Sequence, residues 1–142
     1  MSEPREPKLS FSGIHHIAIA VTDLDAGIEL WRDTLSLPFK GVEEVPEQKV
    51  RVAVFELGPA RIELVCPTSA DSPIAKFLAA RGEGLHHIAL RTTNCSEALE
   101  ELKRVGITLI DEKPRKGAEG AQIGFVHPKS VCGVLVEIVQ PK

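Results

Sequence analysis

Matched histidines and glutamates recur in the two halves of this chain. The tetrapeptide HHIA occurs at 15–18 and again at 86–89, half of the 142-residue length further on. Each copy is followed, a similar distance along the chain, by a glutamate in an apolar stretch before a proline: Glu63 in RIELVCP and Glu137 in VEIVQP. Neutral imidazoles together with carboxylates suit a divalent transition metal. The pattern therefore predicts a duplicated fold with a metal between its halves.

The alternation of strand side chains indicates which histidine of each pair faces the metal. Along the segment IHHIAIAV, His16 shares a face with the small residues Ala18 and Ala20, which suits a cavity wall. His15 falls on the other face with bulky Ile17, which suits the core. The second copy repeats this arrangement, so His86 is expected to be structural. We expect four metal ligands, which are His16, Glu63, His87 and Glu137.

The glutamates support this assignment, because both lie in the middle of an apolar strand. A lone buried charge is very costly, so such a carboxylate is usually paired or metal-bound. A single strand histidine is more often a satisfied or surface group than a ligand, and a single strand glutamate usually points to solvent. Matched pairs in both halves favour the metal site. His127, before a proline, is expected in a loop near the cavity mouth.

The elements that position these residues repeat as well. Each half is expected to form a strand, a helix and three further strands, giving an α+β fold of two tandem βαβββ modules whose curved mixed sheet surrounds the metal. Expected strands in the first half are 14–21, 39–45, 50–57 and 61–65, with a helix from Asp23 or Asp25 to Leu35. Expected strands in the second half are 85–91, 107–110, 121–126 and 133–139, with a helix from Asn94 or Ser96 to Val105.

The domain organisation follows from these elements. Residues 1–10 are expected to form a short flexible tail, and 11–142 a single domain. Within that domain, module 1 covers about 13–67, a linker helix about 72–82, and module 2 about 85–140. The segment 111–120, which carries three basic residues beside two glycines, is expected to be a mobile loop.

Composition excludes several classes of function. The formal net charge is −3, which argues against a nucleic-acid partner. No apolar run approaches the roughly 20 residues of a membrane span, and there is no signal-peptide core, so the expected location is the cytoplasm. The cysteines, Cys66, Cys95 and Cys132, are odd in number and lack metal-type spacing, so reduced thiols are expected.

The chain resembles the vicinal oxygen chelate superfamily and, within it, the methylmalonyl-CoA epimerases. The resemblance covers Gly13 to about Gln140. The matching stretches are IHHIAIAVTDLDAGIELW, VPEQKVRVAVFELGPARIELVCP, DSPIAKFLAARGEGLHHIAL and FVHPKSVCGVLVEIVQ. The DSPIAKFL and HPKS segments are the most specific to the epimerases, whereas the HHIA strands alone would indicate only the superfamily. The family's four metal ligands fall on the four residues that the duplication singles out.

The resemblance implies an enzyme that interconverts (2R)- and (2S)-methylmalonyl-CoA. A proton would leave C2 and return there through a metal-stabilised enolate, with Glu137 and Glu63 as the catalytic carboxylates. The implied metal is Co²⁺, with Mn²⁺, Ni²⁺ or Zn²⁺ as alternatives, and the implied assembly is a homodimer. Some relatives carry a glutamate, proposed as a second base, where this chain has Val52. Glu44, Glu47 or a metal-bound water therefore stay open as the second base.

Other activities of the same fold also stay open. A glyoxalase I-like lactoylglutathione lyase uses a similar ligand set, and a non-catalytic small-molecule binding protein would typically lose ligands that this chain keeps. An iron enzyme that activates oxygen would usually need only two histidines and one carboxylate. Candidate contacts for the phosphates of CoA, or a merely solvated basic loop, are Lys113, Arg115, Lys116 and Lys129. Arg91, on the face of His87, is a candidate for the substrate carboxylate.

Overall fold

The computed structural model describes residues 9–142, and its strands form one sheet. The strands are β1 (Phe11–Ala20), β2 (Phe39–Val45), β3 (Val50–Leu57), β4 (Ala60–Pro67), β5 (Gly84–Thr92), β6 (Arg115–Lys116), β7 (Gln122–Val126) and β8 (Val136–Gln140). The helices are α1 (Leu24–Ile28), α2 (Pro73–Arg81) and α3 (Cys95–Arg104), with a π-helical turn η1 (Glu29–Thr34). Short 3-10 turns are η2 (Pro46–Gln48), η3 (Ala118–Gly120) and η4 (Pro128–Ser130).

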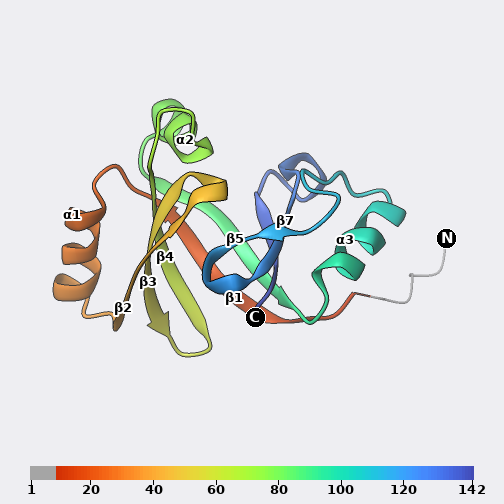
Figure 1. The fold of residues 1–142 in the computed structure, drawn as a ribbon, viewed down its shortest axis with the longest axis horizontal. Helices are drawn as coiled ribbons and strands as arrows, with labels where there is room; N and C mark the ends of the chain where they lie inside the picture. Colours follow the sequence, from red (N-terminus) through yellow and green to blue (C-terminus); the bar gives the residue numbers. More distant parts are fainter. Residues whose placement is uncertain (1–8) are drawn as a thin grey trace.

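The sheet is built symmetrically from the two halves of the chain. Its strand order is β2-β3-β4-β1-β5-β8-β7-β6, so β1 and β5 lie side by side at the centre. They pair antiparallel, while β1 pairs parallel with β4, and β5 pairs parallel with β8. The sheet is therefore mixed, and Figure 1 shows that it is strongly curled. The predicted α+β fold of two βαβββ modules is confirmed.

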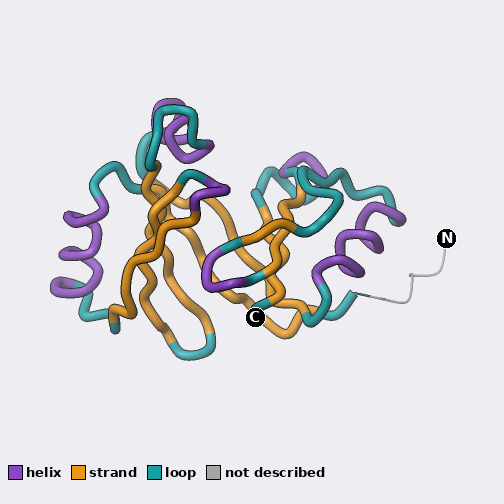
Figure 2. Tube along the Cα trace, in the orientation of Figure 1, coloured by secondary structure: helices purple, strands orange, loops and turns teal. Residues whose placement is uncertain are grey.

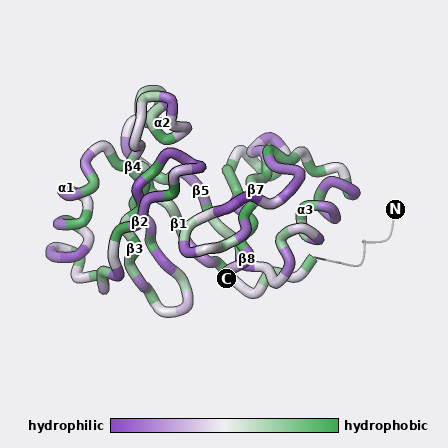
Figure 3. The backbone as a smooth tube through the Cα atoms, in the orientation of Figure 1, coloured by the Kyte–Doolittle hydropathy of each residue, from purple (hydrophilic) through white to green (hydrophobic). Residues whose placement is uncertain are grey.

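The helices α1 and α3 cover the outer side of the curled sheet, at its two ends (Figure 1). Leu24 and Ile28 of α1 pack with Phe55 and Leu64, and Leu99 of α3 packs with strands of module 2. Hydrophobic and hydrophilic residues alternate along both helices in Figure 3, as expected of helices with one face on a sheet. These two helices thus leave the concave side of the sheet uncovered.

Side chains of Asp23, Ser72 and Asn94 cap the three helices at their N-termini. Each accepts a hydrogen bond from a backbone N–H of the first turn, which would otherwise lack a partner. The linker helix α2 packs through Ile74 against the valines of module 1. Among the described residues, no helix combines the length and the apolar character needed to cross a membrane.

Three local features differ from expectation. The strand predicted at 107–110 is reduced to a single bridge between Leu109 and Val126. The predicted loop 111–120 instead contains the short strand β6 and the turn η3, which Figure 2 shows at the centre of the molecule. The first helix ends in the π-helical η1. Apolar content at 107–110 indicated a strand. Ile110 does donate its backbone N–H to Phe125 of β7, but the N–H groups of Ile107 and Thr108 donate to Leu102 and to the side chain of Ser130, so no continuous ladder forms. Of the predicted tail, residues 1–8 lie outside the described part of the chain.

Candidate metal centre and active site

Two histidines from different modules meet at the centre of the sheet. The Nε2 atoms of His16 on β1 and His87 on β5 lie 3.1 Å apart. Oε1 of Glu137, on β8, lies 3.0 Å from the first nitrogen and 3.3 Å from the second. All three side chains are buried. Three of the four predicted ligands therefore converge on one point.

The sheet register explains why these residues meet. Glu63 on β4 has Ala18 as its Cα partner on β1, and Glu137 has Ala89 as its partner on β5. Each alanine is two residues beyond a histidine of the HHIA repeat, on the same face of the strand. Small side chains at these two positions leave room for the carboxylates beside the imidazoles. The repeat thus places equivalent groups on both sides of the central strand pair.

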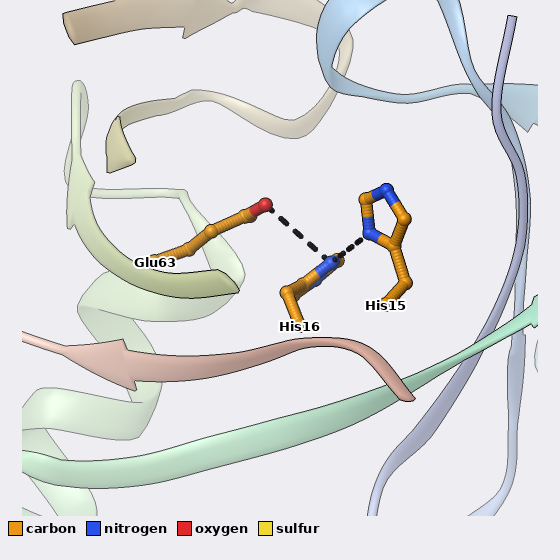
Figure 4. A group of neighbouring side chains, drawn as sticks. All are labelled: His15, His16 and Glu63. Atoms are coloured by element: carbon orange, nitrogen blue, oxygen red, sulfur yellow. Dashed lines mark hydrogen bonds and ion pairs between the residues drawn. The ribbon is translucent and has the colours of Figure 1, made fainter. Parts of the chain in front are cut away.

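Glu63 reaches the same imidazole from its other edge. Its Oε2 lies 3.4 Å from Nδ1 of His16, whereas Glu137 contacts Nε2 of that ring. Figure 4 shows Glu63 and His15 on either side of His16, both pointing towards it. The ligand-type atoms fall into two groups that share His16: one with His87 and Glu137, the other with His15 and Glu63. That Glu63 completes a single four-ligand set stays a prediction.

The donor set fits a divalent transition metal. Ligand atoms about 2.1 Å from an ion lie roughly 3.0–3.4 Å from one another in octahedral or tetrahedral geometry. The separations among His16, His87 and Glu137, 3.0–3.3 Å, fall in this range. Nitrogen and carboxylate oxygen donors together suit cobalt, manganese, nickel or zinc.

The expectation that His15 and His86 face away from the site is wrong. Leu90 and Ala89 are consecutive on β5, but their Cα partners on β1 are Ile14 and His16. His15 is therefore an extra residue in a β-bulge of β1. The second strand has the same irregularity at His86, where Ala18 and Ile19 pair with His87 and Leu85. A bulge breaks the alternation of faces. Both extra histidines consequently line the central cavity.

Each bulged histidine contacts the predicted ligand that follows it. Nδ1 of His15 lies 2.7 Å from Nδ1 of His16, and the corresponding atoms of His86 and His87 are 2.8 Å apart. Burial, and then the charge of the neighbouring imidazole, lower the pKa of His15 and of His86 to about 4. Both rings are therefore neutral near pH 7. The doubled histidine in both repeats was the only sequence signal for this arrangement.

The two carboxylates have opposite electrostatic environments. Burial raises the pKa of Glu63 above its usual range. Burial acts the same way on Glu137, but His87 and His16 outweigh it and lower the pKa of that carboxyl far below its usual range. Burial also opposes a proton on His16, yet its contacts with Glu137 and Glu63 raise the pKa of its ring. A pair with separated pKa values suits one proton donor and one acceptor.

These groups form the floor of a cavity of about 580 Å³ between the modules. Its walls are largely aliphatic and aromatic, with Val52 and Val54 on β3 of one module and Phe125 and Val139 in the other. The ring of Phe125 packs edge-on against His87, with centroids 5.3 Å apart. Apolar walls around a polar floor are typical of small-molecule sites.

The remaining residues that the sequence singled out fall into those that line the cavity and those that do not. Arg115 and Glu47 line the cavity, whereas Lys113, Lys116, Lys129 and Glu44 do not. His127 does not line it either; its Nδ1 accepts a hydrogen bond from the backbone of Lys129 at the start of η4. Arg91 lines a second, smaller cavity of about 260 Å³. The three cysteines are free thiols, as predicted.

Sequence reasoning also missed an ion pair between the modules. Arg61, on β4, forms an ion pair with Glu119 in η3, and both line the cavity. The partners are far apart in the sequence, and only the curling of the sheet brings them together.

Comparisons with known proteins agree with this geometry. Residues 15–125 match the model of the Glyoxalase/Bleomycin resistance protein/Dioxygenase superfamily. The uncharacterized protein YqjC of Bacillus subtilis is 43% identical, over 91% of this chain and 92% of that protein. The mitochondrial methylmalonyl-CoA epimerase of Mus musculus is 36% identical, over 94% of this chain and 76% of that protein. The crystal structure of methylmalonyl-CoA epimerase from Mycobacterium tuberculosis superposes with a TM-score of 0.91 at 34% identity, covering 97% of this chain and 93% of that one.

Proposed function

This chain belongs to the methylmalonyl-CoA epimerase family of the Glyoxalase/Bleomycin resistance protein/Dioxygenase superfamily, and we propose that it interconverts the two C2 stereoisomers of methylmalonyl-CoA. The observation that carries the proposal is the convergence of His16, His87 and Glu137 in a buried cavity. These residues, with Glu63, would hold a divalent metal. We infer Co²⁺ from the family resemblance, with Mn²⁺, Ni²⁺ or Zn²⁺ also compatible with the donors.

The reaction requires a base that removes the proton and a group that stabilises the negative charge left behind. C2 of the substrate carries a proton between a thioester and a carboxylate, and its removal leaves an enolate dianion. A metal bound at the site supplies a Lewis acid that offsets this charge. The protein supplies the fixed floor of histidines and glutamates and the apolar walls, which exclude water and hold C2 in place.

Glu137 is the proton acceptor in this proposal. His16 and His87 keep its carboxyl ionised, as the direction of its pKa indicates. An ionised carboxylate within a buried floor can take a proton from a carbon held above it. The same carboxylate would be one of the residues that hold the metal, so Glu137 would serve both as a ligand and as the proton acceptor.

Glu63 is the proposed partner on the opposite face of C2. It contacts Nδ1 of His16, and Glu137 contacts Nε2, so the carboxylates approach from opposite edges of one ring. Inversion requires removal of a proton from one face and delivery to the other. In the metal-free site, burial raises the pKa of Glu63, so this carboxyl would take up a proton more readily than Glu137 whenever it is not bound to the metal. Val52, also on the cavity wall, offers no proton, while Glu47 lines the cavity as an alternative donor.

The proposal extends to the assembly and location of the protein. We infer a homodimer from the family and from the prevalence of twofold assemblies among small enzymes. A cytoplasmic location is inferred from the composition.

A stereochemical assay tests the function. A single stereoisomer of methylmalonyl-CoA is incubated with the metal-loaded protein, and the fraction inverted is measured by coupling to a stereospecific consuming enzyme. We expect an equal mixture of the two C2 epimers to form. An unchanged stereoisomer, together with turnover of a glutathione hemithioacetal, would instead identify a lactoylglutathione lyase. If neither substrate is turned over and another small molecule binds tightly, the result would favour a non-catalytic binding protein.

A further inference from the structure

Arg61 is a cation placed beside the metal centre. It shares a face of β4 with Glu63, two residues further along, and its Cα partner on β1 is His16. Its side chain is only 21% exposed. It lines both the central cavity and the smaller cavity next to it, which Arg91 also lines. A guanidinium in this position is within the reach of a ligand bound on the polar floor.

In the free protein this guanidinium is occupied by a carboxylate from the other module. Glu119, in η3, forms an ion pair with Arg61 and lies 3.7 Å from Nζ of Lys40 on β2. The backbone N–H of Glu119 donates to both carboxylate oxygens of Glu43, each at 3.0 Å. We call these contacts, of Glu119 with Arg61, Lys40 and Glu43, the Glu119 bridge. The bridge joins η3 of module 2 to β2 and β4 of module 1 across the cavity.

The Glu119 bridge has the properties of a replaceable contact. The Glu119 side chain is 39% exposed, so water screens its ion pair with Arg61, and such pairs contribute little to stability. Glu119 also holds a left-handed backbone conformation, with φ of 56°, which is costly for a residue other than glycine. An incoming oxyanion can therefore take the place of this carboxylate on Arg61 at small cost.

Two other cations of the cavity wall, Lys49 and Arg115, are held differently. Lys49 is paired with Asp71, and both lie in module 1 or the segment after it. Nε of Arg115 lies 3.3 Å from Asp111, four residues away in the same segment. Only for Arg61, among these three, does the carboxylate belong to the opposite module.

We propose that Arg61 binds an oxyanion of the thioester substrate and that Glu119 occupies this position until the substrate displaces it. The ligand chemistry is that of a carboxylate or phosphate, which a guanidinium binds with two parallel hydrogen bonds. The oxyanion is either the carboxylate at C2 or a phosphate of CoA. This inference rests on the proposed function, because it assumes an anionic acyl thioester in the cavity.

Calorimetric titration of the metal-loaded protein tests the proposal with two variants that break one ion pair from its two ends. Arg61→Gln removes the binding group and should weaken methylmalonyl-CoA binding about tenfold, the effect of one charge-assisted interaction. Glu119→Gln removes the competitor and should tighten binding by about twofold or more. Arg32→Gln breaks the exposed pair with Asp33 and is the matched control, with affinity unchanged.

Two further ligands distinguish the source of the oxyanion. Propionyl-CoA keeps the phosphates but lacks the C2 carboxylate, and methylmalonyl-pantetheine keeps the carboxylate but lacks the phosphates. If Arg61 binds the carboxylate, Arg61→Gln weakens methylmalonyl-pantetheine and leaves propionyl-CoA unchanged. If it binds a phosphate, the pattern is reversed. Arg61→Lys keeps the charge but not the two parallel hydrogen bonds, so it should lose part of the affinity, and it provides the measurement if Arg61→Gln does not fold.

Opposite signs for the two variants are the decisive result, because a purely structural ion pair would respond in the same direction from either end. Equal effects of Arg61→Gln and Glu119→Gln, or no difference from Arg32→Gln, would overturn the proposal while leaving the proposed function intact. If the wild-type protein does not bind methylmalonyl-CoA with any of the metals, both this proposal and the proposed function would be rejected.

Discussion

The Nε2 atoms of His16 and His87 lie 3.1 Å apart, although half of the chain separates the two residues. They meet because β1 and β5, the first strands of the two modules, pair at the centre of the sheet. Each module contributes one histidine and one glutamate to the predicted set of metal ligands. A centre built in this way needs both modules in place, so metal binding and the docking of the modules should support each other.

Removal of the metal should destabilise the protein. Two buried carboxylates and two buried imidazoles would lose the group that balances them. A metal present at about 100 times its dissociation constant adds about 2.7 kcal/mol to stability. At about 2–4 °C per kcal/mol, the melting temperature should fall by about 5–10 °C when chelator is added. Thermal denaturation followed by circular dichroism, with and without chelator, measures this. Unchanged melting in a sample shown to have lost its metal would contradict the account.

His87→Ala should weaken cobalt binding by at least about tenfold, because it removes one of the converging nitrogen donors. Competition with a fluorescent chelator reports the affinity without any need for activity. The control is His127→Asn, at a histidine that does not line the cavity and whose capping contact asparagine can replace. Equal metal affinity in the two variants would argue against His87 as a ligand.

Acid should destabilise the fold through the two bulged histidines. The pKa values of His15 and His86 are lowered to about 4 from an ordinary value of 6.5. Protons are therefore taken up on unfolding, and the stability that these rings contribute is present above pH 6.5 and lost as the pH falls towards 4. The double variant His15→Asn/His86→Asn should show a smaller fall in melting temperature across this range. Parallel curves for the two proteins would show that neither ring is responsible.

Gly124 on β7 should not tolerate a side chain. A Cβ at this position would lie 2.6 Å from Cδ1 of Leu99, the buried leucine through which α3 packs on the sheet. Gly124→Ala should cost about 1–3 kcal/mol, as overpacked core substitutions do. Gln122→Ala, at an exposed position of the same strand, should change stability by less than about 0.5 kcal/mol. Urea denaturation of the two variants provides the comparison, and equal midpoints would mean that α3 can shift freely.

The duplicated sequence was sufficient to predict the architecture and the positions of the main site residues. Strand periodicity located β1 and β5, and the repeated HHIA and glutamate positions predicted the convergence of His16, His87 and Glu137. The contacts of His15 and His86 could not be predicted, because a β-bulge depends on the register between two strands rather than on the alternation within one. The same limit applies to Arg61 and Glu119, whose contact depends on how far the sheet curls.

The most direct test of the central claim is the exchange of the C2 proton of methylmalonyl-CoA in heavy water, followed by mass spectrometry. We predict rapid incorporation of one deuterium by the wild-type protein loaded with cobalt or manganese, and none by the stripped protein. Glu137→Gln should slow exchange by at least about 100-fold, the contribution of a positioned base, while calorimetry still detects substrate binding. Exchange at the wild-type rate in Glu137→Gln would contradict the assignment of the base. Its absence from folded, metal-loaded wild-type protein would contradict the epimerase function itself.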